Sequence, residues 1–349
     1  MKPPKSAKPA FLPAPLCPLW FRFLLALLAA ASFSATACSK GNPAPAMGPF
    51  GNPEPPAQAK TEPGLSIADP PVSPAPLPQI DAKRAFQYTR EVTAFGERYI
   101  GNENHKKLEH YILDHLKGDQ VEDDAFTADT VEGKFPVRNI IAKFPGKKDG
   151  IIAILGHYDT NYPLRNTGYV GANDGGSSTA ILLEFANQLR GKTRDGYSVW
   201  LVWTDGEEAV KTWTATDSLY GTRHLAEKWE KDGTLKKIKA LMVMDMIGAQ
   251  DVNVLRDTNS TPWLLDLIHS AAERGGYQSH FYDLQFGEDD DHIPFVQRGV
   301  PCADVISVPY GYNDVFHHTP QDTMDKLSPK SLEIVGNTIL ETIHLLDQR

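Results

Sequence analysis

From residue 80 onward, the spacing of apolar positions changes repeatedly between that of helices and that of strands. Apolar residues three and four apart predict amphipathic helices, and short unbroken apolar runs predict buried strands. The predicted helices cover 82–95, 104–116, 177–189, 217–229, 260–275 and 328–347. The predicted strands cover 137–144, 151–159, 198–203, 239–248 and 301–308, the first two as neighbours in the sheet. This alternation predicts an α/β fold, a single three-layer α/β/α domain with a mostly parallel, mixed central sheet.

Residues 1–38 have the pattern of an export signal. Lys2, Lys5 and Lys8 precede the apolar run FRFLLALLAAASFSA, which leads to the sequence ATAC at 35–38. A basic start, a short apolar run and small residues before a cut describe a signal peptide, and the run is too short to span a membrane. Cys38 after small residues resembles the bacterial lipobox, although Ala stands where Leu is usual. We therefore expect a lipid on Cys38, with ordinary cleavage nearby as the alternative.

The stretch after the signal predicts a tether. Residues 39–79 contain GNPAPAMGPFGNPEPP and PPVSPAPLP, a proline density that blocks helices and predicts an extended, disordered segment. The zinc-dependent catalytic domain proposed below would then occupy 80–349. The expected protein is an exported monomer, anchored by its lipid at the periplasmic or outer cell surface of a bacterium. With Cys17 removed and Cys38 lipidated, only Cys302 remains, so no intramolecular disulfide is expected.

Composition and charge exclude one class of partner. The chain has 349 residues, of which 41% are hydrophobic and 23% charged, as in soluble globular proteins. Its formal net charge is −9. A nucleic-acid partner is not expected, because nothing offsets the repulsion between this charge and phosphate groups.

Acidic and imidazole side chains gather where the predicted strands end. They are His157, Asp159, Asp174, Asp205, Glu207, Glu208, Asp245, Asp289, Asp290, Asp291, His292, His317 and His318. Open α/β sheets bind ligands beyond the carboxyl ends of their strands, so these groups should converge on one rim. Together they would repel one another unless a cation lay among them. Carboxylates and imidazoles without thiolate suit zinc at an open, catalytic site. His105, His110 and His115 share a helical face and are expected at the surface.

The motifs GHYDT, GANDGG, DGEE, MDMIG and HHT resemble those of the glutaminyl-peptide cyclotransferases and the related di-zinc aminopeptidases. The resemblance runs from about Phe86 to the C-terminus. Three longer stretches favour the cyclotransferases: DGEEAVKTWTATDSLYGTRHLA, DDHIPFVQRGVP and FHHTPQDT. It implies a zinc aminopeptidase-like fold and an aminoacyltransferase. This enzyme would convert the N-terminal Gln of peptides or proteins to pyroglutamate with release of ammonia.

The resemblance also implies how the site works. Asp174, Glu208 and His318 match the residues that hold one zinc ion, which polarises the side-chain carbonyl of the substrate. Glu207 matches the general acid/base, which takes a proton from the attacking α-amine and returns it to the leaving nitrogen.

Four further positions match residues around that centre. Asp245 and Asp290 match two aspartates that share a hydrogen-bond network with the general acid/base. Trp213 matches an aromatic wall of the substrate pocket. His317 stands where cyclotransferases usually have Trp, so the mouth of the pocket, and with it the substrate preference, should differ.

Two alternatives remain. With His157 and Asp245 as additional ligands and Asp174 as a bridge, a second zinc fits, and the enzyme would be a di-zinc aminopeptidase. The ligands alone do not choose, but aminopeptidases commonly have Ser where this chain has Asp290, as in the cyclotransferases. The other alternative is a binding protein that has lost its chemistry. It would lack a ligand or the base, yet Glu207 and the ligand residues are all present.

Overall fold

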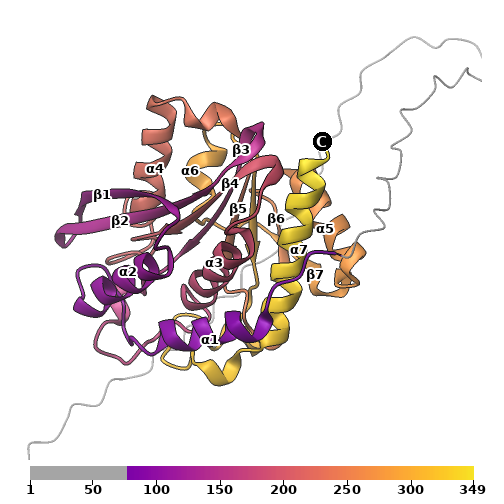
Figure 1. Ribbon diagram of the computed structural model, residues 1–349. Coiled ribbons are helices and arrows are strands. Elements are labelled where there is room, and N and C mark those ends of the chain that lie inside the picture. The colour runs from indigo at the N-terminus through magenta and orange to yellow at the C-terminus, as the bar shows by residue number, and fades with distance from the viewer. Residues whose placement is uncertain (1–76) are drawn as a thin grey trace, which may run out of the picture. The chain divides into compact units, whose positions relative to one another are not determined.

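The computed structural model describes residues 77–349, so the predicted signal segment and nearly all of the predicted tether lie outside the described residues. A six-stranded sheet with helices on both faces forms the centre of this part of the chain (Figure 1). Its strands are β1 (Gln120–Thr130), β2 (Gly133–Phe144), β3 (Gly146–His157), β4 (Arg194–Thr204), β5 (Ile238–Asp245) and β8 (Cys302–Ile306). The helices are α1 (Ala82–Thr93), α2 (Glu103–His115), α3 (Gly176–Leu189), α4 (Tyr220–Lys231), α5 (Pro262–Gly275), α6 (Ile293–Val296) and α7 (Pro329–Asp347).

The sheet is mixed but mostly parallel, as predicted. Its strand order is β1-β2-β4-β3-β5-β8. Strands β4, β3, β5 and β8 are parallel, while β1 and β2 run antiparallel at one edge. A small parallel pair, β6 (Val254–Asp257) and β7 (Phe281–Phe286), lies outside this sheet. Because four neighbouring strands are parallel, their carboxyl ends share one edge, where the functional residues are expected.

One expectation about the sheet is wrong. Strands β2 and β3 were expected to be neighbours, but β4 lies between them and pairs with both. The chain crosses the start of β4 at Pro145 and Gly146, where a Cβ on Gly146 would lie 2.3 Å from the carbonyl oxygen of Gly196. Only glycine allows so close a crossing. A long apolar strand such as β4 gains burial on both faces and hydrogen bonds on both edges from this central place.

Side chains of the central strands enter two cores, one on each face of the sheet. In β3, Ile152 and Ile154 pack in the core that contains α1, α3, α5 and α7. Ala153 and Leu155 pack in the opposite core with residues of α4 and α6. Cys302, the one cysteine among residues 77–349, is buried at the start of β8. In this part of the chain no helix has the length and apolarity needed to cross a membrane.

Candidate metal centre and active site

Three parallel strands end in side chains that the sequence analysis singled out. His157 ends β3, Asp245 ends β5, and Glu207 and Glu208 lie three and four residues after Thr204, the last residue of β4. A cavity of about 430 Å³ opens at this edge. It is lined by all eight residues expected for a one-zinc site: Asp174, Glu207, Glu208, Trp213, Asp245, Asp290, His317 and His318.

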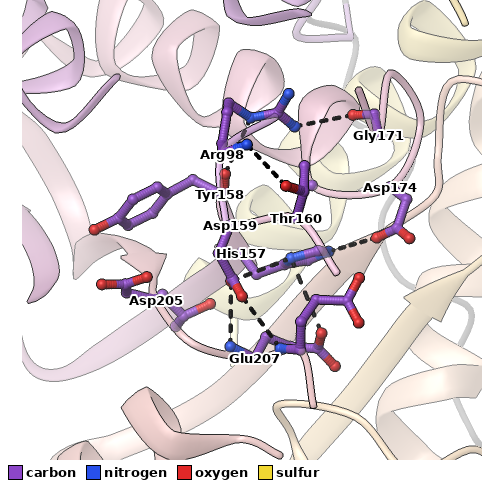
Figure 2. A network of polar contacts seen from close by, with 12 residues as sticks. Arg98, His157, Tyr158, Asp159, Thr160, Gly171, Asp174, Asp205 and Glu207 are labelled. Carbon is purple, nitrogen blue, oxygen red and sulfur yellow. Dashed lines mark hydrogen bonds and ion pairs between the residues drawn. The ribbon is translucent and has the colours of Figure 1, made fainter. Parts of the chain in front are cut away.

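The carboxylate of Asp159 fixes the backbone that carries both glutamates. One of its oxygens accepts a hydrogen bond from the backbone amide of Glu207 at 3.2 Å (Figure 2). The other accepts one from the backbone amide of Glu208 at 3.3 Å. Asp159 is buried, so water does not compete for these bonds. The two glutamate side chains diverge from this support. Glu208 extends toward His318, whereas Glu207 lies nearer His157.

Asp174, Glu208 and His318 meet at one imidazole nitrogen. The Nε2 of His318 lies 3.3 Å from Asp174 Oδ2 and 3.2 Å from Glu208 Oε1. Neighbouring ligands of a tetrahedral zinc ion, with bonds of about 2.0–2.1 Å, are separated by about 3.3 Å. Both distances therefore match those between ligands of one zinc ion. Two carboxylates and one imidazole leave a fourth position, as catalytic zinc sites do.

The charges of these groups favour a cation at the same place. Burial alone would lower the pKa of His318, but the carboxylates of Glu208 and Asp174 outweigh it and raise this pKa to about 11. Burial would raise the pKa of Asp174, yet His157 and His318 hold it well below its usual range. The carboxylates thus stabilise positive charge at the imidazole nitrogen. A zinc ion bound there supplies that charge, with the imidazole neutral.

Outer partners orient the carboxylate ligands. The Tyr169 hydroxyl donates to Oδ2 of Asp174, and the amide of the Asn161 side chain donates to Oε2 of Glu208 at 2.7 Å. Such partners fix the direction of metal ligands and tune their basicity. The backbone of His318 has φ 49°, in the left-handed region that non-glycine residues rarely adopt. Strain of this kind collects at functional sites, where the surrounding structure enforces it.

Asp322 anchors the backbone of the loop that carries Asp174. Its carboxylate accepts hydrogen bonds from the backbone amides of Asn173 at 2.9 Å and Asp174 at 3.1 Å. It also accepts one from the Tyr310 hydroxyl at 3.0 Å. Burial and the charge of Asp174 raise the pKa of Asp322 to about 7. Asp322 therefore positions a ligand without being one itself.

Arg98 joins the same loop to the end of β3 (Figure 2). The guanidinium is fully buried and donates to four backbone carbonyl oxygens. These belong to Gly96, Tyr158, Val170 and Gly171. Tyr158 immediately precedes Asp159, and Gly171 lies three residues before Asp174, so Arg98 holds together the two segments that support the centre.

A second group of ligands shares Asp174. The Nε2 of His157 lies 3.0 Å from Asp174 Oδ1 and 3.2 Å from Asp245 Oδ1. Each oxygen of Asp174 thus faces a different imidazole, which is the arrangement of a bridging carboxylate. These are the three residues expected for a second zinc, and the structure brings them together.

Glu207 is held among other acids. Burial and the charges of Glu208 and Asp290 raise its pKa well above the usual range. The expected hydrogen-bond network is not found: among residues 77–349 no hydrogen bond joins the carboxyl group of Glu207 to Asp245 or Asp290, and Asp290 acts on Glu207 through its charge. Burial and Asp245 also raise the pKa of Asp290, and Asp304 lies beside Asp290 with a raised pKa. Crowded buried carboxyl groups of this kind share protons.

Trp213 and His317 are partly exposed parts of the cavity lining. The Trp213 residue is 37% exposed. Its loop is held by Asp217, whose carboxylate accepts the amides of Val210, Lys211 and Thr212 at 2.9–3.0 Å. The side chain of His317 is 29% exposed and lies 3.2 Å from Asp314.

One histidine was expected at the surface and is not there. His105 is buried, and its Nε2 lies 2.7 Å from Asp205 Oδ1. Burial opposes its charge, but Asp205 and Glu109 outweigh burial and raise its pKa to about 10. This face of α2 turns inward because Asp205, two residues before Glu207, supplies a buried partner. His110 on the same helix is exposed, as expected.

Several supporting residues carry no signal that single-sequence analysis recognises. Arg98, Asn161, Tyr169 and Asp322 act through partners distant in the chain; the Arg98 bond to Gly171, for example, spans 73 positions. Asp159 was noted at the acidic rim, but its role as an acceptor for two backbone amides was not.

The chain is similar to several known proteins. Residues 139–343 match the model of peptidase family M28. The chain is 32% identical over 255 residues to the glutaminyl-peptide cyclotransferase of Drosophila melanogaster, covering 64% of this chain and 70% of that protein. It is 48% identical in sequence to an Acidobacteriales bacterium glutaminyl cyclase of known crystal structure. The two structures superpose with a TM-score of 0.78, over 81% of this chain and all of that one. A leucine aminopeptidase precursor from Bacteroides thetaiotaomicron, at 23% identity and a TM-score of 0.67, shares the fold over 77% of this chain and 98% of its own.

Proposed function

The chain belongs to peptidase family M28, and from that premise we propose that it is a zinc-dependent glutaminyl-peptide cyclotransferase. It would convert the N-terminal Gln of a peptide or protein to pyroglutamate and release ammonia. One observation carries the proposal: Asp174, Glu208 and His318 come together as a set of zinc ligands in one cavity. Glu207 lines the same cavity but is not part of this ligand set. The likeness to known glutaminyl cyclases supports the same conclusion.

Asp174, Glu208 and His318 would hold the zinc ion. When bound, zinc supplies Lewis-acid polarisation of the side-chain carbonyl of the substrate Gln. The residues around it fix that centre: Asn161 and Tyr169 orient the two carboxylates, which keeps the ligand oxygens in place between turnovers.

Glu207 would move the proton. Burial and the neighbouring carboxylates raise its pKa well above the usual range, which suits a group that must both accept and return a proton. The substrate α-amine loses a proton to Glu207 and attacks the side-chain carbonyl carbon. A C–N bond closes the five-membered ring, the bond to the amide nitrogen breaks, and the proton leaves with that nitrogen as ammonia. The nucleophile belongs to the substrate, so proximity supplies much of the rate.

The apolar part of the remaining lining suits the small, uncharged side chain of Gln, while Glu288 and Asp289 make the rest of it acidic. Met246, Ile306 and Val308 add apolar surface to the lining, and Trp213 adds an aromatic wall at the mouth. Asp245 and Asp290 lie close enough to raise the proton affinity of the acidic cluster, and we assign them the role of tuning Glu207.

One specific observation favours a second function. His157, Asp174 and Asp245 could hold another ion, and two zinc ions would suit a di-zinc aminopeptidase that hydrolyses N-terminal residues from peptides. We propose one zinc per chain, because Asp290 stands where Ser is common in aminopeptidases. Metal analysis of the purified chain should give about one zinc. Two zinc ions would favour the aminopeptidase.

A paired peptide assay tests the reaction itself. The zinc-loaded chain is incubated with a Gln-initiated peptide and, separately, with a Leu-initiated one. We expect ammonia and a pyroglutamyl peptide from the first and no free leucine from the second. Glu207→Gln should abolish turnover and keep zinc, whereas Glu208→Gln should lose zinc. Free leucine without ammonia would overturn the proposal, and loss of zinc in Glu207→Gln would overturn the assignment of roles.

We also propose that the enzyme works outside the cytoplasm, as a monomer tied to a bacterial membrane by a lipid on Cys38. The N-terminal pattern of residues 1–38 and the proline-rich 39–79 support this. Cells fed a labelled fatty acid should label the wild-type chain and not Cys38→Ser. Label on both proteins, or on neither, would contradict the proposed lipid anchor.

A further inference from the structure

Two neighbouring imidazoles face the same carboxylate at the mouth of the cavity. One ligand atom each of Asp174, His317 and His318 lie within 4.8 Å of one another. We propose that His317 is an exchangeable fourth zinc ligand, which binds the ion in the free enzyme and leaves it when the carbonyl of the substrate arrives. This inference rests on the proposed zinc-dependent cyclase and adds a residue that the resemblance assigns only to the pocket mouth.

The backbone explains why both imidazoles lie on one side. Successive side chains of an extended chain point to opposite faces. His318 instead has φ 49°, and its ring centroid lies 4.2 Å from that of His317 with the planes at 45°. Asn313 and Asp314, earlier in the same loop, also have positive φ values of 54° and 62°. Non-glycine residues adopt such angles only where surrounding contacts enforce them, so this loop is held in a special shape.

Asp314 orients His317 in the manner of a metal ligand's partner. The Nδ1 of His317 lies 3.2 Å from Asp314 Oδ2. Asp314 Oδ1 accepts the backbone amide of Tyr310 at 2.7 Å, which fixes the carboxylate. A proton donated from Nδ1 to Asp314 leaves Nε2 with a free lone pair. Metal-binding histidines commonly have a carboxylate on the other ring nitrogen, because it sets the tautomer and raises basicity.

Spacing makes His317 the ligand that exchanges, since exposure does not separate the two imidazoles: the side chain of His318 is 38% exposed and that of His317 is 29% exposed. The Nε2 of His318 already lies 3.3 Å from Asp174 Oδ2 and 3.2 Å from Glu208 Oε1. In the described part of the chain the only carboxylate that His317 pairs with is that of Asp314. Ligands of a tetrahedral zinc ion lie about 3.3 Å apart, so the separation of His317 from Asp174 and His318, which is at most 4.8 Å, closes with a shift of at most about 1.5 Å. A fourth protein ligand would protect the resting ion, and its departure would open the position that catalysis needs.

X-ray absorption at the zinc edge counts the imidazoles directly. We expect two imidazole ligands in the zinc-loaded full-length chain and one in His317→Phe. We also expect one in Glu207→Gln mixed with a Gln-initiated peptide, since that variant should bind substrate without turnover. A single imidazole in the free wild-type enzyme would overturn the proposal, and this measurement needs no variant to fold.

Zinc release to an excess of chelator gives an independent measure. His317→Phe should release zinc at least tenfold faster than wild type, and Asp314→Asn a few-fold faster. His110→Phe is the matched control, because His110 is exposed on α2 and should leave the rate unchanged. Equal rates for wild type, His317→Phe and Asp314→Asn would overturn the proposal. A chain that cyclises Gln-peptides with one imidazole on zinc refutes only this inference, whereas a chain without zinc or pyroglutamate refutes the proposed function.

Discussion

Arg98→Met isolates the contribution of one buried guanidinium to the active-site framework. The Arg98 side chain is 0% exposed and donates to four carbonyl oxygens. No ion pair joins it to a carboxylate in the described part of the chain. Burial lowers its pKa to about 10, and the charges of nearby acids, Asp322 and Asp174 among them, oppose this effect. Methionine keeps most of the apolar stem and removes every donor.

The size of the effect follows from what the substitution leaves behind. Each buried carbonyl without a donor costs about 1–3 kcal/mol, but the burial of a charge is relieved at the same time. We expect a net loss of about 3–5 kcal/mol, the range for breaking a buried charged network. Typical domains have only about 5–15 kcal/mol of stability. For a domain of this size the melting temperature should fall by roughly 6–20 °C.

Urea unfolding and calorimetry of wild type and variant measure both quantities. Arg98→Lys keeps the charge, but one ammonium group cannot reach all four carbonyls. The stability of this variant should therefore lie between those of Arg98→Met and the wild type. Arg165→Met is the matched control, because Arg165 is exposed and donates to only one carbonyl, that of Tyr162 at 3.0 Å. It should change stability by less than about 0.5 kcal/mol. A loss below about 1 kcal/mol in Arg98→Met would refute the view that this guanidinium holds the loops.

Three other perturbations give distinct outcomes. His105→Gln should lower the free energy of unfolding most below pH 6.5, because the folded state raises the pKa of His105 to about 10. In urea unfolding, the difference in this free energy between variant and wild type should shrink as pH rises toward 10. A difference that grows with pH would contradict the ion pair. Asp217→Ala removes the acceptor of three amides in the Trp213 loop, so KM for Gln-peptides should rise about tenfold with zinc content unchanged, whereas loss of zinc would indicate wider damage. Removing zinc should lower the free energy of unfolding by about 2.7 kcal/mol relative to enzyme in free zinc at 100 times the dissociation constant. The melting temperature should fall accordingly. That shift should be absent in His318→Ala, and its persistence there would place the stabilising ion elsewhere.

The central architecture could be predicted because its signals are local. The Val199–Trp203 run and the apolar face of 177–189 encode a buried strand and a helix within a few residues. Strand β1 was missed, since QVEDDAFTADT is largely polar and its structure depends on pairing with β2 along its whole length. The pair β6 and β7 was also missed: β6 has only four residues, and Leu284 and Phe286 of FYDLQF in β7 are exposed instead of entering the core. Where a strand is stabilised by its neighbours, its own residues say little.

The candidate site divides in the same way. Acidic and imidazole residues at strand ends can be found from the sequence, because residue type and position both follow from the chain order. Which of them touch could not be derived, since the contact between Asp174 and His318 depends on how distant loops close. The burial of His105 was missed because its partner, Asp205, lies 100 positions later. Arg98 was invisible for a related reason: its acceptors are backbone carbonyls, which any sequence provides.

Cys302 sits at the start of β8 with its thiol shielded from solvent, and burial raises the pKa of that thiol. With no second cysteine among residues 77–349, this part of the chain has no cross-link to make or to lose. Glutathione or an oxidising environment should leave its folding unchanged. Residues 77–349 can therefore be produced in the reducing interior of an ordinary expression host and should match the same residues matured under oxidising conditions in their unfolding midpoint.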